Sequence, residues 1–209
     1  MTPSLKKTYL NIARCKDCPD LRTDCWARGE GNPTADIVLI GESPGQVEAS
    51  KHRPFVGPAG RLLRKVLKQA GIPVEAVYLT NVVKCWPQNK DLLTDTHAQK
   101  CARFLHFELK QVQPDLVVCL GRFAFESLIH EPVEHMADFD KIWLQRRILG
   151  MDRKVNVCLM YHPAAALRHK PYLDAFREQM EWLSRQWEWG TGNLQDLSFE
   201  KVIFSRSII

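Results

Sequence analysis

The stretch Asp36-Ile37-Val38-Leu39-Ile40-Gly41-Glu42-Ser43-Pro44-Gly45 decides the fold of this chain. Four consecutive apolar residues, Ile37 to Ile40, lie between Asp36 and Gly41. An unbroken apolar run of this length is typical of a strand that is buried on both faces. Such strands occur in parallel sheets that helices cover on both sides. The stretch therefore predicts a parallel sheet, with a turn directly after Gly41.

The rest of the chain alternates further strands with helices. Apolar runs predict strands at Val77–Val83, Asp115–Leu120 and Val155–Met160. Helical spacing of apolar residues predicts helices at Leu5–Arg14, Gly60–Ala70, Thr94–Val112, Arg122–Ile129 and Tyr172–Arg185. Residues 131–153 are less regular and predict a connecting hairpin or loop. The alternation indicates an α/β protein, a three-layer α/β/α fold with a central four-stranded, mainly parallel sheet. We expect one domain over residues 1–189, including the amino-terminal segment, and a tail over residues 190–209.

The composition is that of an ordinary globular protein. The chain has 209 residues, of which 45% are hydrophobic and 25% charged, and a formal net charge of +5. This mild positive charge is compatible with a nucleic-acid partner but does not require one. No apolar signal-peptide region follows the polar residues Met1–Lys7, and no apolar run is long enough to span a membrane. We therefore expect a cytoplasmic, nucleoid-associated monomer with no membrane contact.

Four cysteines have a spacing that favours metal binding: Cys15, Cys18, Cys85 and Cys101. The first two form a C-x-x-C loop, and the other two lie far downstream in the sequence. The four can meet only if this loop folds back onto the body of the domain. Disulfides are rare inside cells, and seven cysteines are an odd number. Four thiolates suit either an iron–sulfur cluster or zinc. Cys119 and Cys158 lie in apolar strands and are expected in the core, and Cys25 lies outside the pattern.

Polar residues follow three of the predicted strands: Gly41-Glu42, Asn81 and His162. In parallel sheets the carboxyl ends of the strands form the crevice where ligands bind. The long loop after the first strand adds Glu48 and Phe55, which favours a ligand pocket over a simple connector. The Asn81 amide offers a donor and an acceptor to the edge of a base. The plain alternatives are an Asn81 that braces a turn and a His162 that is a core histidine.

Arg168, His169 and Lys170 form a short basic run after His162. A solvated surface segment explains the run equally well as contacts with phosphates.

Taken in order, these motifs resemble the family 4 (thermophile-type, iron–sulfur) uracil-DNA glycosylases. The resemblance extends from Cys15 to about Leu183 and rests on Cys15-x-x-Cys18, Gly41-Glu42-Ser43-Pro44-Gly45, Glu48, Arg53-Pro54-Phe55-Val56-Gly57-Pro58-Ala59-Gly60, Thr80-Asn81-Val82-Val83-Lys84-Cys85, Asn89, Cys101, Tyr161-His162-Pro163 and Leu167-Arg168. One departure is His52, which stands where the family usually has glycine.

The resemblance implies a uracil-DNA glycosylase fold and a structural [4Fe–4S] cluster that Cys15, Cys18, Cys85 and Cys101 ligate. It implies monofunctional hydrolysis of the N-glycosidic bond of deoxyuridine in single- or double-stranded DNA. The product is an abasic site, as in base excision repair.

The resemblance also implies a role for individual residues. His162 would donate a hydrogen bond to the leaving uracil, and Glu42 or Glu48 would position water or stabilise the sugar cation. The residues that would bind the uracil nucleotide are Gly41, Phe55, Asn81 and Asn89. Leu167 and Arg168 would enter the DNA minor groove.

Three alternatives stay open at this point. One is a damaged-DNA binding protein without catalysis, and another is a glycosylase for a different deaminated base such as hypoxanthine. The third is a zinc-stabilised nucleotide-binding domain with no role on DNA.

Overall fold

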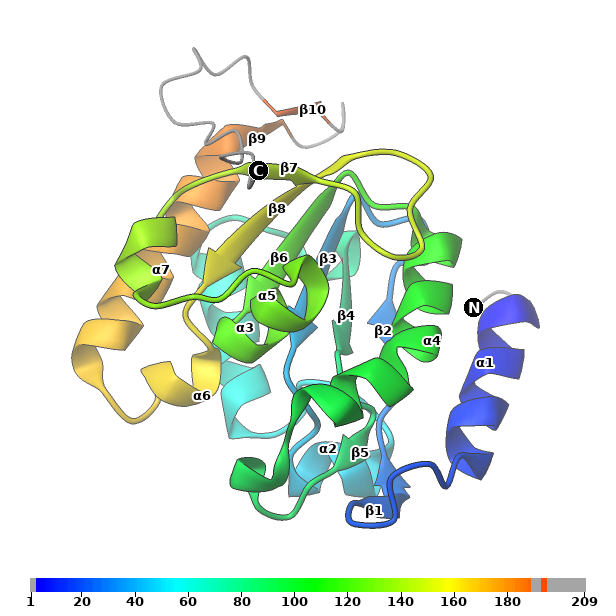
Figure 1. Ribbon diagram of the computed structural model, residues 1–209. Helices are drawn as coiled ribbons and strands as arrows, with labels where there is room; N and C mark the ends of the chain where they lie inside the picture. The colour runs from blue at the N-terminus through cyan, green and yellow to red at the C-terminus, as the bar shows by residue number, and fades with distance from the viewer. Residues whose placement is uncertain (1–2, 189–192, 195–209) are drawn as a thin grey trace, which may run out of the picture.

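The protein is built around a six-stranded sheet. Figure 1 shows this sheet and the helices that surround it in the computed structural model, which describes residues 3–188 and 193–194. The strands follow the order β2-β4-β3-β6-β8-β7. They are β2 (Glu30–Gly31), β3 (Ile37–Gly41), β4 (Val77–Asn81), β6 (Leu116–Leu120), β7 (Leu144–Arg146) and β8 (Val155–Met160). The α-helices are α1 (Pro3–Arg14), α2 (Gln46–Lys51), α3 (Pro58–Gln69), α4 (Asp95–Val112), α5 (Arg122–Ile129), α6 (Pro163–Ala166) and α7 (Lys170–Gln186).

Smaller elements complete the described part of the chain. Strand β1 (Arg22–Trp26) pairs with β5 (Cys85–Trp86), and β9 (Trp187–Glu188) pairs with β10 (Asn193–Leu194). The 3-10 turns are η1 (Val74–Ala76), η2 (Lys90–Leu92) and η3 (Met136–Phe139). The predicted tail over 190–209 lies outside the described residues, apart from β10.

The four predicted parallel strands are confirmed as β4, β3, β6 and β8, which are parallel to one another in that order. The expected count of four strands was too low, because β2 and β7 add antiparallel edges to the same sheet. These edges have two and three residues. Segments this short carry no readable apolar pattern, so only the tertiary pairing reveals them.

Helices cover both faces of the sheet, which confirms the three-layer α/β/α architecture. On one face, α1, α4 and α5 pack against strand residues such as Val38, Val117 and Val157. On the other face, α3 and α7 pack against the strand side chains that point the opposite way, such as Leu39 and Val118. Successive strand side chains point to opposite faces, so the fully apolar strands provide both cores. None of the described helices combines the length and apolarity needed to cross a membrane.

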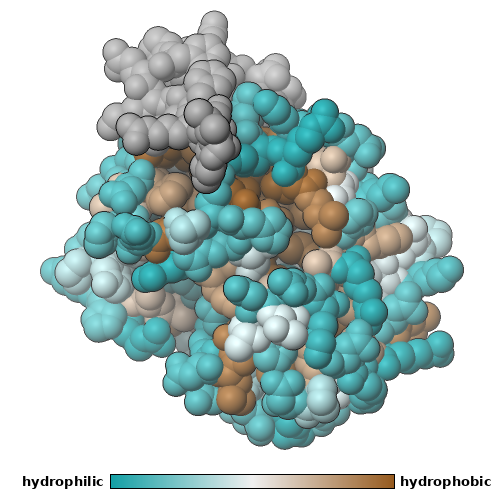
Figure 2. All heavy atoms as spheres, in the orientation of Figure 1, coloured by the Kyte–Doolittle hydropathy of each residue, from teal (hydrophilic) through white to brown (hydrophobic). Residues whose placement is uncertain are grey.

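The surface that carries α4 and α5 is mostly hydrophilic, with hydrophobic atoms gathered in a hollow near its middle (Figure 2). A cavity of about 460 Å³ opens between these two helices, and its lining includes Leu105, Leu128 and the exposed Leu149. It is distinct from the site at the strand ends.

Gly60 allows the start of α3 to press against the backbone of Phe55. A Cβ placed on Gly60 would lie 1.9 Å from the Phe55 carbonyl oxygen, far inside contact distance. Phe55 itself has a left-handed backbone with φ of 52°, so its position depends on this close fit. The glycine at position 60 is therefore a packing requirement.

We expect Gly60→Ala to lower the free energy of unfolding by about 1–3 kcal/mol, because the added methyl overpacks a buried backbone contact. Urea denaturation at neutral pH measures the change. Lys65→Ala, at an exposed position of the same helix, is the control and should stay within about 0.5 kcal/mol. Equal stability of the two variants would show that α3 tolerates the shift.

Candidate active site and cysteine site

A cavity of about 300 Å³ opens at the carboxyl ends of β3, β4 and β8. Its lining includes six predicted site residues, namely Glu48, Phe55, Asn81, His162, Leu167 and Arg168, and also Lys90. The topology predicted this convergence, because the parallel strands all end at the same edge of the sheet. Helix α2, the loop after it and the turn at α6 form the walls.

Three predicted site residues do not line this cavity. Gly41 lies directly behind it, since a Cβ there would be 2.5 Å from Asn81 Oδ1 and 2.7 Å from Phe55 Cζ. Glu42 forms an ion pair with Lys90, with 3.3 Å between Oε1 and Nζ. Asn89 is exposed, and its Oδ1 accepts a hydrogen bond from the Asp91 N–H at the start of η2, 3.1 Å away.

Phe55 and Asn81 form the buried floor of the cavity. They are 5% and 4% exposed, and both approach the bare backbone of Gly41. Within the described part of the chain the side-chain amide of Asn81 makes no hydrogen bond, so its donor and acceptor are both available to a ligand. The ring centroids of Phe55 and His162 are 6.5 Å apart.

His162 has one tautomer in this structure. Its Nδ1 accepts a hydrogen bond from the Ala164 backbone N–H at 3.0 Å, so the neutral ring carries its proton on Nε2. Burial, with smaller contributions from the positive charges of Lys90 and Arg168, lowers the pKa of His162 to about 3. At neutral pH the ring is therefore an uncharged hydrogen-bond donor.

Glu48 braces the loop around the cavity. Its Oε1 accepts a hydrogen bond from the Gly57 N–H at 2.6 Å, at the amino terminus of α3. A carboxylate in this position is favoured by the helix dipole. Glycine at 45 and 57 leaves room for the carboxylate, since a Cβ on either residue would lie within 3 Å of its oxygens.

Two contacts stabilise the end of the α2–α3 loop that directly follows α2. Arg53 makes a bidentate ion pair with Glu30 of β2, with N–O distances of 2.7 and 2.5 Å. His52 ends α2 in a left-handed conformation with φ of 51°, a backbone conformation that glycine adopts most easily. A 2.9 Å hydrogen bond between His52 Nδ1 and the Trp26 carbonyl, with ring contact to Trp26, stabilises the histidine.

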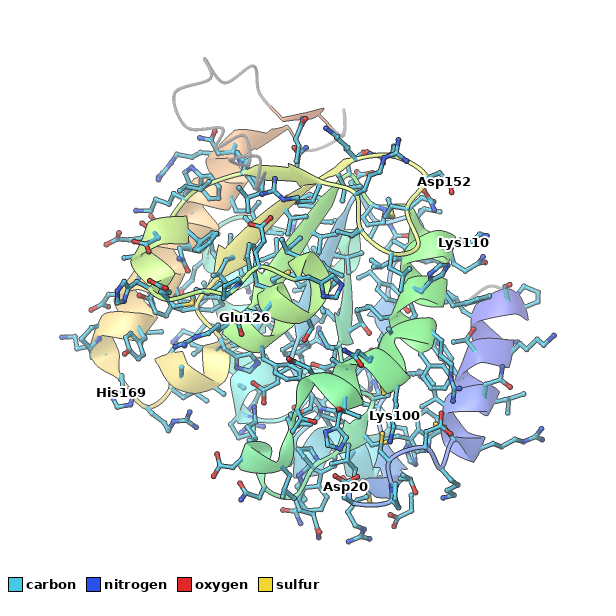
Figure 3. All side chains as sticks on the ribbon, viewed as in Figure 1. Asp20, Lys100, Lys110, Glu126, Asp152 and His169 are labelled. Atoms are coloured by element: carbon cyan, nitrogen blue, oxygen red, sulfur yellow. The ribbon has the colours of Figure 1, made fainter. Side chains whose placement is uncertain are left out.

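The segment after His162 forms the outer wall. Leu167 is 51% exposed although it lines the cavity, and Arg168 stands beside it. His169 extends outward from the turn between α6 and α7 (Figure 3). An exposed apolar side chain next to cations is suited to contact with a polyanion that also offers apolar surfaces.

Sequence reasoning gave no role to several residues that line the cavity, including Ser43 and Lys90. The Ser43 hydroxyl is buried and has no hydrogen-bond partner among the described residues. Lys90 follows Asn89 in the loop after β5. The only available signal was their place inside quoted motifs or next to them, and neither spacing nor periodicity indicates which way a loop residue points.

The four cysteines Cys15, Cys18, Cys85 and Cys101 line one small void between α1, α4 and β5. The amino terminus therefore folds back onto the domain as expected. In the ranges 3–188 and 193–194, no group of three or more His, Cys, Asp and Glu side chains is arranged to hold a metal ion. Lys100 and Asp20 lie at this end of the molecule (Figure 3).

The surroundings of the cysteines provide hydrogen bonds to sulfur. Arg103 Nη2 donates to Cys15 Sγ at 3.3 Å, and the Lys84 backbone N–H donates to Cys101 Sγ at 3.5 Å. Burial, with repulsion from the neighbouring cysteines, raises the pKa of Cys85 to about 12. Burial also raises the pKa of Cys101 to about 11. Such thiols become thiolates when a metal replaces their protons. The donor set thus fits a metal centre.

Cys119 and Cys158 are fully buried in β6 and β8, as expected of core residues. Cys25 lies on β1, outside the lining of the four-cysteine void.

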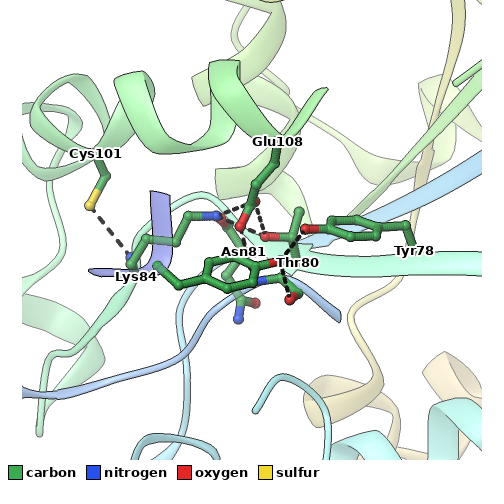
Figure 4. A network of polar contacts seen from close by, with 8 residues as sticks. Tyr78, Thr80, Asn81, Lys84, Cys101 and Glu108 are labelled. Carbon is green, nitrogen blue, oxygen red and sulfur yellow. Dashed lines mark hydrogen bonds and ion pairs between the residues drawn. The ribbon is translucent and has the colours of Figure 1, made fainter. Parts of the chain in front are cut away.

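A buried polar network joins the two sites (Figure 4). Lys84 Nζ and Glu108 Oε2 are 2.7 Å apart, and their side chains are 1% and 0% exposed. Neither residue was predicted to matter, because a charged residue in a helix or strand is ordinarily at the surface.

The chain is similar to several known proteins. The family model described as the uracil DNA glycosylase superfamily matches residues 28–187. A protein named type-4 uracil-DNA glycosylase from Archaeoglobus fulgidus is 37% identical over 85% of this chain and 88% of its own length. Proteins of the same name from Sulfurisphaera tokodaii and Pyrobaculum aerophilum are 33% and 34% identical, over 84% and 81% of this chain and 81% and 87% of their own lengths.

Proposed function

Because the chain belongs to the uracil DNA glycosylase superfamily, we propose that it removes uracil from DNA as a monofunctional glycosylase. The observation that carries this proposal is the meeting of Phe55, Asn81 and His162 in one cavity at the strand ends. The relatives' shared name favours neither a binding-only protein nor a zinc-stabilised nucleotide-binding domain. Action on another deaminated base is not favoured either.

We propose that the cavity receives a uracil flipped out of the base stack. Phe55 offers a buried ring for stacking, and the free amide of Asn81 matches the adjacent N3–H donor and O4 acceptor of uracil. Cytosine presents the reverse pattern at these two positions. Leu167 would fill the space that the base leaves, while Arg168 contacts phosphate.

Hydrolysis joins the oxygen of water to the sugar C1′ and leaves the bond's electron pair on N1 of uracil. His162 supports this step as a neutral donor, its Nε2–H directed to the oxygen where negative charge develops. The departing uracil anion takes a proton from solvent, and the attacking water gives up a proton to solvent as it becomes the hydroxyl on C1′.

The two acids have different positions in this scheme. Glu48 lines the cavity and uses one oxygen to hold Gly57, so its other oxygen can orient water. Glu42 forms an ion pair with Lys90 and does not line the cavity, so we propose for it only an electrostatic effect on the sugar cation. Lys90 is half-exposed and ion-paired, unlike the desolvated lysines that form Schiff bases, which supports a glycosylase without strand cleavage.

The cysteine site supports a [4Fe–4S] cluster held by Cys15, Cys18, Cys85 and Cys101. Four cysteine thiolates are the usual ligand set of a [4Fe–4S] cluster. When bound, the cluster would crosslink the amino-terminal loop, β5 and α4. None of these four cysteines lines the cavity, which supports a structural role.

The test is release of uracil from an end-labelled oligonucleotide with one deoxyuridine, in single- and double-stranded form. Cleavage of the labelled strand only after alkaline treatment is expected for a monofunctional enzyme. Parallel thymine and hypoxanthine substrates define specificity. Cluster-loaded protein that binds the uracil strand but releases no base would contradict the proposal.

We expect His162 to stay neutral from pH 8 down to about pH 4, because its pKa lies near 3. NMR of the ring nitrogens should show the Nε2–H tautomer throughout this range, and single-turnover cleavage should show no inflection near pH 6.5 that depends on His162. In the unfolded chain the imidazole takes up a proton near pH 6.5, so its contribution to stability is retained above that pH and is lost as the pH falls from 6.5 toward 3. A His162 titration near 6.5 in the folded protein would contradict the structure.

A further inference from the structure

We propose that Lys84 is a positioning residue that holds Asn81 in place for reading uracil; this rests on the proposed function of the cavity. Lys84 touches no part of the cavity itself. Its ammonium donates to the Asn81 backbone carbonyl at 2.7 Å, to Thr80 Oγ1 at 2.8 Å and to Glu108 Oε2 at 2.7 Å (Figure 4).

The Asn81 carbonyl needs such a donor because the sheet does not provide one. The N–H of Val82 bonds to the Gly41 carbonyl of β3. The C=O and N–H of a trans peptide point in opposite directions, so the Asn81 carbonyl points away from β3. On that side β2 pairs with β4 only at Tyr78 and Leu79. Lys84 thus takes the place of the missing strand partner.

The side chain of Asn81 depends on this hold. Its amide has no hydrogen bond within the described residues, so its direction follows from the backbone and from its close approach to Gly41. The peptide bond after Asn81 is fixed from one side by Gly41 and from the other by Lys84. If the hydrogen bond from Lys84 is lost, this peptide bond can rotate, and the side-chain amide of Asn81 then points in a different direction relative to the base.

Glu108 fixes the ammonium of Lys84 in turn. Its Oε1 accepts from the Gly29 N–H at 2.9 Å, and its Oε2 accepts from Thr80 Oγ1 at 2.6 Å, besides the contact with Lys84. Every oxygen of this buried carboxylate is therefore engaged. A buried ion pair of this kind contributes little net stability compared with apolar replacements, which makes a geometric role the better explanation.

The decisive variant removes both charges together, as Lys84→Met with Glu108→Gln. The glutamine keeps an oxygen that accepts from the Gly29 N–H. Because both charges are removed, no buried charge is left without a partner. We expect kcat/KM for uracil release to fall about 10-fold, and Asn81→Ala in the same background to add little further loss, because the two changes act through one side chain. Tyr78→Phe is the matched control: it removes the 3.0 Å contact with Tyr9 in the same network without touching Lys84, and should change kcat/KM less than 2-fold.

A second readout does not depend on turnover. The side-chain amide signals of Asn81 in the NMR spectrum should shift in the double variant and stay in place in Tyr78→Phe. If the double variant loses cooperative unfolding, Lys84→Met with Glu108→Leu replaces it.

Unchanged amide signals with kcat/KM within 2-fold of wild type, or losses that multiply when Asn81→Ala is added, would overturn the role of Lys84. Wild-type protein that releases no uracil would instead contradict the proposed function, and the amide signals would still test the hold on Asn81.

Discussion

Replacing His162 with alanine should slow uracil release by about 10²–10³-fold, which is about 3–4 kcal/mol of transition-state stabilisation. The imidazole is neutral, and the Ala164 N–H occupies its Nδ1, so Nε2–H is the one donor that it can offer the developing anion. An alanine removes this donor and leaves Phe55 and Asn81 to bind the base. The loss should therefore appear in single-turnover rate at saturating enzyme and only weakly in affinity for uracil-containing DNA.

The matched control is His135→Ala, at an exposed position before η3. It should leave the single-turnover rate within 2-fold of wild type. A His162→Ala protein that cleaves at the wild-type rate would remove His162 from the chemistry, and a protein that cleaves normally but binds poorly would make it a binding residue.

Replacing Cys85 with serine should yield colourless protein of much lower stability. Cys85 is 6% exposed, begins β5 and lines the void with the other three cysteines, so its loss removes one of the four proposed cluster ligands. Binding of a structural metal site contributes on the order of 10 kcal/mol that is coupled to folding, and a hydroxyl is a poor ligand for iron. Visible absorbance, iron content and thermal unfolding of anaerobically prepared protein measure the effect.

Cys25→Ser is the control for this experiment. Cys25 belongs to β1 and does not line the void, so the variant should keep its colour, its iron and its unfolding temperature. A coloured and stable Cys85→Ser protein would exclude Cys85 as a ligand. Wild-type protein that is colourless and loaded with zinc would contradict the iron–sulfur proposal.

The sequence by itself determined the layered architecture and the place of the cavity. Runs such as Ile37–Ile40 are apolar on both faces of the strand, and this property alone requires helices on either side of a parallel sheet. The ends of such strands meet at one edge, so Asn81 and His162 had to come together. Phe55 reaches the same place because the long loop that carries it returns to this edge of the sheet.

Only the tertiary structure decided how the loop residues face that cavity. Asn89 and Lys90 are neighbours in the chain, yet Asn89 caps a surface turn while Lys90 lines the cavity, because a loop has no periodicity that fixes side-chain direction. The short edge strands β2 and β7 were missed because pairing, rather than apolar pattern, creates them.

The tertiary structure also decided that Lys84 and Glu108 are buried. Pattern reasoning assigns charged residues to the surface, since a lone buried charge is costly. Here the cost is offset because Lys84, which follows β4, meets Glu108 of α4. Thr80 and the Asn81 carbonyl add hydrogen bonds to this pair. No local rule can foresee that meeting, because it depends on where the helix lies against the sheet.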